Sequence, residues 1–457
     1  MTSGSPAVAE AMSYDGFGAP TLFSGTLNGT PVGGVTLAYD AAGRISQKND
    51  AWAFPMVVPQ PAMSTAEWTY TYDEAGRLAT ATRTGEATRT YTYDARGNRS
   101  AISPSEDPAK APDEQDRMPQ VGQPGDADYT TYTYDAHGNV TGRTANGVTH
   151  TFTWDGEGSL LGVKQGGADI VTYDVDAKGR RVGRRVGTNL THQWFYDGQL
   201  RIVGEVVYGA TPSYRVYGYV GERHLPVTMV ETKGAITSSY RIFGDHLGSL
   251  RAVVRTSGTV GQVVQSMRHG PWGELDAEWL DAGFARVPFG FAGGVFETVT
   301  GLVRFGAREY DPRTGRWLTK DEARFGGGEN FYEYANPNPV NWIDLNGRGP
   351  IQFVKCLASG KSFAECWDDE YDRLAGFGSE PPDDPTDTHD PSAAETCSQH
   401  PRGSGLRFDC CAHHCDFVED MCPSTAVAEC MTECTAAPHV PIPAGVVRPG
   451  KPAGPFR

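Results

Sequence analysis

A short motif recurs through the first half of the chain and constrains its fold more than any other feature. It consists of an aromatic or apolar residue, then Asp, and in most copies Gly three residues after the Asp. The copies begin at Tyr14, Tyr39, Tyr72, Tyr93, Tyr134, Trp154, Val175 and Tyr196. Most neighbouring copies are 20 or 21 residues apart, and the interval of 41 between Tyr93 and Tyr134 is about two periods. A fixed period of this kind indicates one supersecondary unit used many times.

Each copy has the chemistry of a strand–turn–strand unit. Asp at the first position of a turn accepts hydrogen bonds from nearby backbone N–H groups, and Gly supplies the positive φ that closes a short hairpin. The stretch "RTYTYD" alternates so that Tyr91 and Tyr93 share one face, which is typical of a half-buried strand. Calcium binding by these turns is the alternative, but each turn offers too few oxygens for a six- to eight-ligand site. We therefore interpret these aspartates as turn formers.

One long interval interrupts the repeat. Residues 103–128 are rich in Pro and acidic residues ("SPSEDPAKAPDEQDRMPQVGQPGD"). Such a composition buries too little apolar surface to fold by itself. The sequence therefore predicts a disordered insertion there.

Composition limits the class of protein. The 457 residues include 56 Gly and 31 Pro, which favours strands and tight turns over long helices. The formal charge of −16 argues against sequence-independent binding to nucleic-acid phosphates.

The sequence also bears on where the protein is found. We find no apolar run long enough to span a membrane and no signal peptide at the start. All nine cysteines follow residue 347, and clustered cysteines favour an oxidising compartment, so we expect a secreted or cell-surface protein exported by a non-classical route or lacking an upstream segment.

The Tyr-Asp repeat resembles that of the Rhs/YD-repeat family, which includes teneurins and the C components of bacterial insecticidal toxin complexes. Residues 243–275 resemble the family's D-H-L-G-S segment and the strand pair and turn that follow it. Residues 290–347, from "GFAGG" to "IDLNG", resemble the Rhs repeat-associated core, which is the family's hallmark. Repeats and core together cover about three quarters of the chain.

This resemblance implies a mainly β fold. Residues 1–242 would form part of the wall of a hollow shell, as a β-sheet that spirals, and residues 243–347 would be the core that closes it. The chain is shorter than shell-forming relatives, so an incomplete wall would leave strand edges without partners. A second shell-forming chain could therefore serve as a partner that completes the wall.

Two carboxylates in the core, Asp321 and Asp344, lie on either side of a Gly-rich turn and an aromatic segment. A chain that returns on itself would bring them together. Two carboxylates that share one proton can activate a water for attack on a peptide carbonyl. From the residues alone, both aspartates suit turns beside Gly and Asn equally well.

The family resemblance assigns them a role. Self-cleaving Rhs-type proteins use an Arg and two Asp of the core, which match Arg308, Asp321 and Asp344 here. The cut would fall between Arg348 and Gly349. Arg308 would orient a carboxylate or polarise the scissile carbonyl. Three positions depart from the family's pattern: Glu322 and Leu345 each stand in place of Pro, and Arg348 stands in place of Leu.

The region after the core has another chemistry. We expect a helical segment over 348–377, an acidic Pro-rich linker over 378–408, a Cys-rich helical hairpin over 409–435 and a flexible tail over 436–457. Residues 348–457 hold 9 basic and 17 acidic residues, which disfavours a nuclease.

The spacing of four cysteines predicts disulfides. Cys411 and Cys415, and likewise Cys430 and Cys434, have the i, i+4 spacing that places two cysteines on one helix face. Two antiparallel helices would then be joined by Cys411–Cys434 and Cys415–Cys430 disulfides.

Zinc held by Cys411, His413, His414 and Cys415 with Cys430 and Cys434 is an alternative, although zinc sites more often show C-x2-C spacing. A catalytic Cys–His pair is a second alternative. The remaining five cysteines leave an odd thiol. We expect neither a metal nor a cofactor.

Three functions follow from these features. The first hypothesis is an Rhs-type carrier whose core can cleave itself after Arg348 and which encloses or delivers the C-terminal module as cargo. Alternatively, it is a non-catalytic structural or adhesive surface protein. A third hypothesis places a toxin enzyme in the C-terminal tail.

Overall fold

The computed structural model describes residues 7–54, 62–101, 112–122, 124–125, 129–221, 223–257, 261–321 and 330–348. The chain divides into two compact units, Met1–Gly378 and Ser379–Arg457, and all the described residues belong to the first. The predicted helical segment, linker, Cys-rich hairpin and tail lie outside the described residues, apart from Arg348. The four candidate disulfide cysteines, Cys411, Cys415, Cys430 and Cys434, lie there too.

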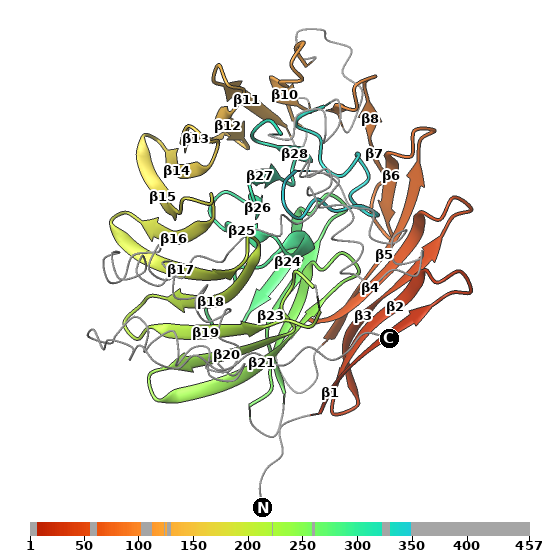
Figure 1. Cartoon of the computed structure of the whole chain (residues 1–457). Coiled ribbons are helices and arrows are strands. Elements are labelled where there is room, and N and C mark those ends of the chain that lie inside the picture. Colours follow the sequence, from red (N-terminus) through yellow and green to blue (C-terminus); the bar gives the residue numbers. More distant parts are fainter. Residues whose placement is uncertain are drawn as a thin grey trace, which may run out of the picture. The chain divides into compact units, whose positions relative to one another are not determined.

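Two large antiparallel meanders dominate the described residues (Figure 1). The first is a seven-stranded sheet of β1 (Val8–Tyr14), β2 (Pro20–Leu27), β3 (Thr30–Tyr39), β4 (Ile45–Phe54), β5 (Ala62–Tyr72), β6 (Leu78–Arg83) and β7 (Arg89–Thr90), in chain order. A two-stranded sheet of β8 (Thr92–Tyr93) and β9 (Arg99–Ala101) follows it. Within each of these sheets, every strand pairs with its neighbours in sequence, as expected of repeated hairpins.

The second meander is a fifteen-stranded sheet, also in chain order. Its strands are β10 (Gln120–Val121), β11 (Thr130–Tyr134), β12 (Val140–Ala145), β13 (Val148–Trp154), β14 (Leu160–Gln165), β15 (Ala168–Val175), β16 (Arg181–Val186), β17 (Asn189–Asp197), β18 (Arg201–Val207), β19 (Ser213–Gly218), β20 (Thr228–Lys233), β21 (Ile236–Gly244), β22 (Leu250–Arg255), β23 (Gln262–His269) and β24 (Leu275–Leu280). The sheet thus continues past residue 242, where we had placed the border between wall and core. We call these two large sheets the wall.

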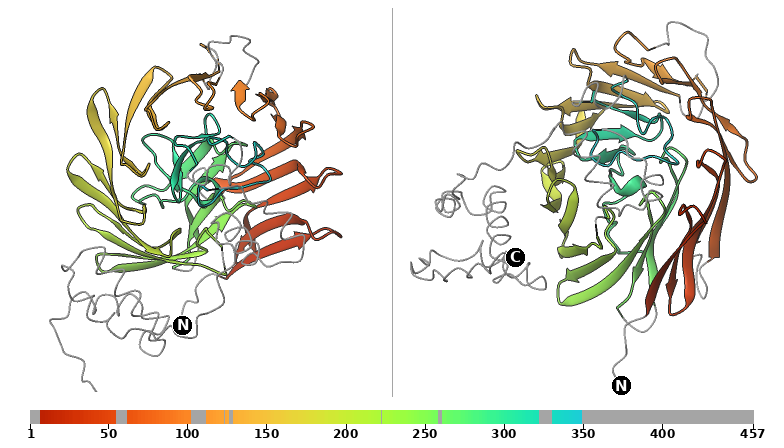
Figure 2. Two further views of the ribbon diagram at one scale, coloured as in Figure 1. Left: turned by 45° about the horizontal axis from the view of Figure 1, so that its top comes forward. Right: turned by 45° about the vertical axis from the view of Figure 1, so that its right-hand side comes forward.

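The rest of the described chain is compact and sparse in regular structure. It holds a four-stranded sheet of β25 (Val295–Phe296), β26 (Val303–Phe305), β27 (Arg308–Asp311) and β28 (Arg316–Trp317). The three-residue 3-10 helix η2 (Phe291–Gly293) is the one helix in this part of the chain that the structure describes. Residues 284–321 and 330–348, which we call the plug, lie between the two large sheets (Figure 2). The prediction of a mainly β fold is confirmed for the residues that the structure describes.

The repeated Asp forms the turn in most units. In the second copy, the Asp40 N–H donates to the Arg44 carbonyl at 2.8 Å, and Oδ1 of Asp40 accepts the N–H groups of Ala42 and Arg44, both at 2.9 Å. Gly43 has a φ of 75°, which an L residue adopts only at a cost. The same pattern recurs at the turns that begin with Asp15, Asp94, Asp155, Asp176 and Asp245. The prediction that these aspartates form turns is confirmed.

One more turn of this kind lies inside the predicted disordered insertion and corrects that prediction. The Asp113 N–H donates to the Arg117 carbonyl at 3.1 Å, and Asp116, with a φ of 60°, stands where the other copies have Gly. Met118 and Val121 after the turn are fully buried, and Val121 belongs to β10. Residues 112–122 are therefore an ordered repeat. The motif was missed because Asp116 replaces the Gly that marks the other turns.

The repeated aromatic residue joins one unit to the previous one. The hydroxyl of Tyr72 donates to the Ile45 carbonyl at 2.6 Å, and that of Tyr93 donates to the Leu78 carbonyl at 2.7 Å. In each case the acceptor is the first residue after the previous turn. Tyr134, Trp154 and Tyr196 make the same bond to Met118, Val140 and Arg181. The period of the repeat is thus the length of chain that returns an aromatic side chain to the preceding turn.

The same post-turn residues also bind the plug, through their N–H groups. Ile45 donates to Oδ1 of Asn341 at 2.8 Å, Leu78 donates to the Pro337 carbonyl at 2.9 Å, and Val140 donates to the Leu318 carbonyl at 2.8 Å. Backbone groups buried here need partners because there is little water to bond them. Three turns of the wall, at 40–44, 73–77 and 135–139, are therefore attached to the plug.

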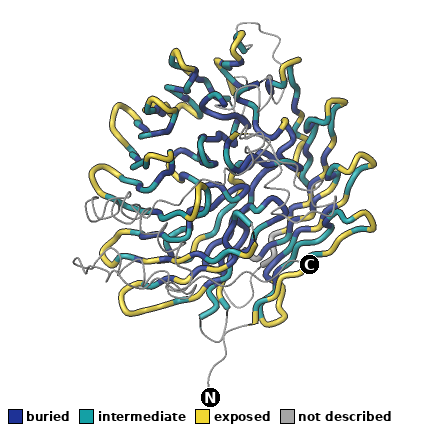
Figure 3. Tube along the Cα trace, in the orientation of Figure 1, coloured by how far each residue is buried: buried dark blue, intermediate teal, exposed yellow. Residues whose placement is uncertain are grey.

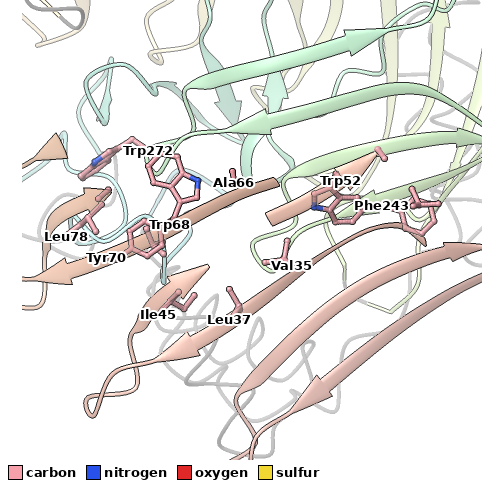
Figure 4. Close-up of a cluster of buried hydrophobic side chains, with 14 of the residues drawn as sticks. Val35, Leu37, Ile45, Trp52, Ala66, Trp68, Tyr70, Leu78, Phe243 and Trp272 are labelled. Carbon is pink, nitrogen blue, oxygen red and sulfur yellow. The ribbon is translucent and has the colours of Figure 1, made fainter. Parts of the chain in front are cut away.

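Burial alternates residue by residue along wall strands such as β13 and β19, as in a pleated sheet with one covered face. Exposed positions gather at the hairpin loops that join the strands (Figure 3). The largest buried cluster joins the first sheet to the end of the second. It contains Trp52 and Trp68 of the first sheet beside Phe243 and Ala252 of the second and Trp272, which follows β23 (Figure 4). Burial of aromatic side chains of this size is the main contribution to the contact between the sheets.

We expect the bond between repeats to contribute measurably to stability. Tyr134→Phe keeps the ring but leaves the Met118 carbonyl without its donor, so we expect a loss of about 1–2 kcal/mol in the free energy of unfolding. Tyr214→Phe, at an exposed tyrosine, is the matched control. Urea denaturation followed by circular dichroism measures both. Equal midpoints for the two variants would contradict the role of this bond.

Candidate functional site

The three residues assigned by family resemblance meet inside the plug. Nη2 of Arg308 lies 2.7 Å from Oδ2 of Asp321 and 3.1 Å from Oδ2 of Asp344. All three side chains are buried, with exposed fractions of 3%, 7% and 2% respectively. One guanidinium therefore bridges two carboxylates that come from separate segments of the plug.

Local structure explains how they converge. Arg308 begins β27, which pairs with β26 and β28, and Asp321 follows β28 by a few residues. Asp344 belongs to the segment 330–348, which returns to the same sheet. Backbone bonds hold that return: the Trp317 N–H donates to the Tyr332 carbonyl at 3.0 Å, and the Asp321 N–H donates to the Phe331 carbonyl at 3.0 Å.

The Arg308 side chain is fixed from several directions. Its guanidinium carbon lies 4.2 Å from the centre of the Trp317 ring, a cation–π contact. Its Nη1 donates to the Phe331 carbonyl at 3.3 Å. Burial lowers the pKa of Arg308, and the Asp321 and Asp344 carboxylates oppose that shift. Its Nε is buried and has no acceptor among the described residues.

The predicted cut lies at the border of the described chain. Oδ1 of Asp344 accepts the N–H of Arg348 at 3.1 Å, so the residue before the predicted cut is bound to one of the two carboxylates. Gly349 lies outside the described residues. The second carboxylate of the cluster, Asp321, lines an open cavity of about 620 Å³. Arg308 and two turns of the wall, at 135–139 and 155–158, line the same cavity.

A close backbone contact positions the segment before Arg348. The Ala307 N–H donates to the Asn346 carbonyl at 3.1 Å. Gly347 has a φ of 69°, and a Cβ on it would lie 2.8 Å from the Phe305 carbonyl oxygen and 3.1 Å from the Arg308 nitrogen. Only glycine allows the chain to pass so close to the β26–β27 turn.

Sequence reasoning missed the buried ion pairs that join the plug to the wall. Glu309 accepts from Arg181 of the wall and from Arg304 of the plug, both at 2.7 Å. Asp311 and Glu297 of the plug likewise pair with Arg143 and Arg184 of the wall, at 3.0 and 2.9 Å. The one available signal was the density of arginine in "GRRVGRR", which does not reveal the partners.

The fold and this site together define a wall of Tyr-Asp repeats attached to a plug that holds a buried Arg–Asp–Asp cluster. A protein-family model described as Teneurin YD-shell matches residues 3–342. The chain therefore belongs to the teneurin YD-shell family, as the sequence predicted.

Individual relatives include teneurins, a bacterial tRNA nuclease and a bacterial deaminase toxin. Teneurin-3 of Mus musculus is 26% identical over 324 residues, which are 68% of this chain and 11% of that protein. The tRNA3(Ser)-specific nuclease WapA of Bacillus spizizenii is 28% identical over 287 residues, 60% of this chain and 12% of the nuclease. The double-stranded DNA deaminase toxin A of Burkholderia cenocepacia is 31% identical over 231 residues, 45% of this chain and 16% of the toxin. The chain thus matches less than a fifth of the length of each.

Among solved structures, the crystal structure of TcdB2-TccC3-Cdc42 aligns with a TM-score of 0.40 and 18% identity, over 77% of this chain and 21% of that chain. No helix among the described residues is long and apolar enough to cross a membrane.

We expect the fold to be destabilised strongly when one member of a pair between plug and wall loses its charge. Glu309→Gln would leave Arg181 and Arg304 buried without a counter-charge, so we expect a loss of about 3–5 kcal/mol in the free energy of unfolding. Asp174→Asn, which removes the exposed partner of Arg185, is the control and should change stability by less than about 1 kcal/mol. Urea unfolding compares the two. If both variants lose a similar, small free energy of unfolding, the buried pairs of Glu309 contribute no more to stability than the exposed pair of Asp174.

Proposed function

We propose that this chain is a shell segment of a toxin carrier and that its plug cuts the chain between Arg348 and Gly349. One observation carries the proposal: Arg308 bridges Asp321 and Asp344 in a buried cluster, and Asp344 binds the N–H of Arg348, the residue before the cut. Relatives whose names describe a nuclease and a deaminase toxin support the carrier role.

The two carboxylates have different surroundings, which suggests different roles. Asp344 is engaged by Arg308 through one oxygen and by the Arg348 N–H through the other, so it positions the scissile segment. Asp321 lines the open cavity, so it can reach a water. A carboxylate beside a bound water is a suitable general base.

In the proposed reaction, water attacks the carbonyl carbon of Arg348 and gives a proton to Asp321. The Nε of Arg308, which has no acceptor among the described residues, is available to stabilise the oxyanion. Collapse of the tetrahedral intermediate breaks the bond to the Gly349 nitrogen, which takes the proton back from Asp321. The products are a carboxylate on Arg348 and a free amine on Gly349.

The cargo in this proposal is the C-terminal region that follows the cut, residues 349–457. Within it we propose the Cys411–Cys434 and Cys415–Cys430 disulfides, in a protein that is secreted or displayed at the cell surface. The strands β1 and β24 each have one paired neighbour in the described sheets, which leaves an edge where strands of a second shell-forming chain could add. A toxin enzyme within residues 348–457 is compatible with the same carrier.

Self-cleavage should depend on both aspartates. Intact mass under denaturing conditions should give two pieces that meet at Arg348–Gly349 for the wild type, and one chain of 49.3 kDa for Asp344→Asn and Asp321→Asn. Asp169→Asn, at an exposed carboxylate paired with Lys164, is the control and should be cut like the wild type. A wild type that stays whole would reject self-cleavage. It would leave Arg308 and its partners as a structural ion cluster in a non-catalytic surface protein.

Cleavage should also depend on the close approach at Gly347. Gly347→Ala would push the segment away from Arg308, so we expect cleavage to slow by about tenfold or more. Gly301→Ala is a matched control, because Gly301 has a φ of 72° but no atom within 4 Å of the place where a Cβ would lie, so the backbone cost is similar without the clash. A time course of the cleaved fraction compares them. Equal rates would show that the contact does not position the bond.

A further inference from the structure

A buried polar layer lies where the first sheet meets the end of the second, within an otherwise apolar contact. Lys48 and Asp50 of β4 face Arg251 of β22, and His269 ends β23. Asp50 pairs with Arg251, and Nζ of Lys48 lies 3.7 Å from Oδ2 of Asp50. All four side chains are at least nine-tenths buried. No part of the proposed cleavage chemistry uses them.

Two histidines lie in this layer without full hydrogen bonding. Neither ring nitrogen of His269 has a partner among the described residues. His246, in the turn between β21 and β22, bonds the Val340 carbonyl of the plug through Nε2 at 3.1 Å, and its Nδ1 has no partner there. A protonated imidazole carries two N–H donors, so each histidinium would bury at least one unsatisfied donor.

The charges in the layer balance only while the histidines are neutral. Lys48 and Arg251 are offset by Asp50 and by Asp245, whose Oδ1 accepts the N–H groups of Leu247 and Ser249. His269 faces Arg251 and Lys48, both cations. His246 faces Asp245 and Lys48.

The neighbouring charged groups are occupied with other partners. Arg268 and Asp276 pair with each other at 2.6 Å, and Oε2 of Glu274 accepts the Trp272 N–H at 2.9 Å. Tyr70 of β5 borders the same space. The small cavity between Lys48, His246 and His269 measures about 10 Å³, barely enough for one water and too small for a hydrated counter-ion.

We propose that the contact between β4 and strands β22 and β23 is a seam that opens in mildly acidic solution, through protonation of His269 and His246. This inference concerns the wall and does not depend on self-cleavage. Opening would let water reach the new charges and would separate the first sheet from the end of the second. A carrier built in this way would loosen in an acidified compartment.

The direction of the pH dependence follows from the histidines. Burial lowers the pKa of His246 to about 4 and that of His269 well below its usual value, and Arg251 and Lys48 lower that of His269 further. In the open state both return toward the ordinary value of about 6.5. The closed seam therefore has its full stability above about pH 6.5 and loses it as the pH falls below that value. Burial also lowers the pKa of Lys48 to about 8, so Lys48 is already charged at neutral pH.

Hydrogen exchange of the full-length protein, corrected for the intrinsic pH dependence of exchange, tests the seam. Between pH 7 and pH 5 we expect exchange in β4, β22 and β23 to rise about tenfold per pH unit for each proton taken up. Strands β13–β16, remote from the layer in sequence, should keep their protection. Unchanged protection of β4 down to pH 5, or loss of protection in both regions together, would overturn the proposal.

Variants separate this mechanism from a general loss of stability. His269→Leu removes one titrating group, and Lys48→Met removes one of the cations that it faces, so each should shift seam opening to lower pH. His137→Gln, at an exposed histidine of a wall turn, should leave the opening pH unchanged. A purely structural role predicts the opposite for Lys48→Met, namely weaker protection at every pH with no shift in the profile. Opening pH values equal to that of the wild type in both seam variants would reject the assignment.

Discussion

The structure depends on the hydrogen bonding of the backbone at one kind of turn. In most repeats an Asp carboxylate accepts one or two N–H groups of its own turn, and a left-handed residue closes the loop. The first residue after the turn then has both of its backbone groups assigned: its carbonyl accepts from the aromatic residue of the next repeat, and in several repeats its N–H donates to the plug. Because buried backbone groups must be bonded, this residue determines both the repeat length and the place of the plug.

The plug is held by charge as well as by backbone bonds. Its acidic residues Glu297, Glu309 and Asp311 each pair with an arginine of the wall. Both members of the Glu309 and Asp311 pairs are buried, and Arg184 beside Glu297 is part-buried. Buried pairs of this kind add little net stability compared with apolar packing, but an unpaired member is costly. They therefore favour one position of the plug over alternatives. The Arg308 cluster sits within this arrangement and takes its geometry from it.

Part of the candidate site was predictable and part was not. Arg308, Asp321 and Asp344 could be named from motifs that resemble a known family, and the structure places them in direct contact. Nothing in the sequence indicated the Trp317 ring beside Arg308 or the close passage of Gly347 along the β26–β27 turn. Both depend on how residues 330–348 return to the four-stranded sheet, which is a property of packing. The ordered turn at Asp113 was missed for a simpler reason, since Asp116 adopts a conformation that the motif assigns to Gly.

Local structure could be read from the amino-acid sequence alone: the mainly β fold, the turn at each repeated Asp and the order of the strands. These follow from interactions within a repeat or between adjacent repeats, such as the bonds between Asp40 and its own turn. Which charges meet was settled only by the packing of the sheets and the plug. Asp50 and Arg251 are 201 residues apart, and Arg143 and Asp311 are 168 apart. The partner of a buried charge is determined by how one sheet packs against another. The residues next to that charge in the sequence do not indicate which distant residue it will contact.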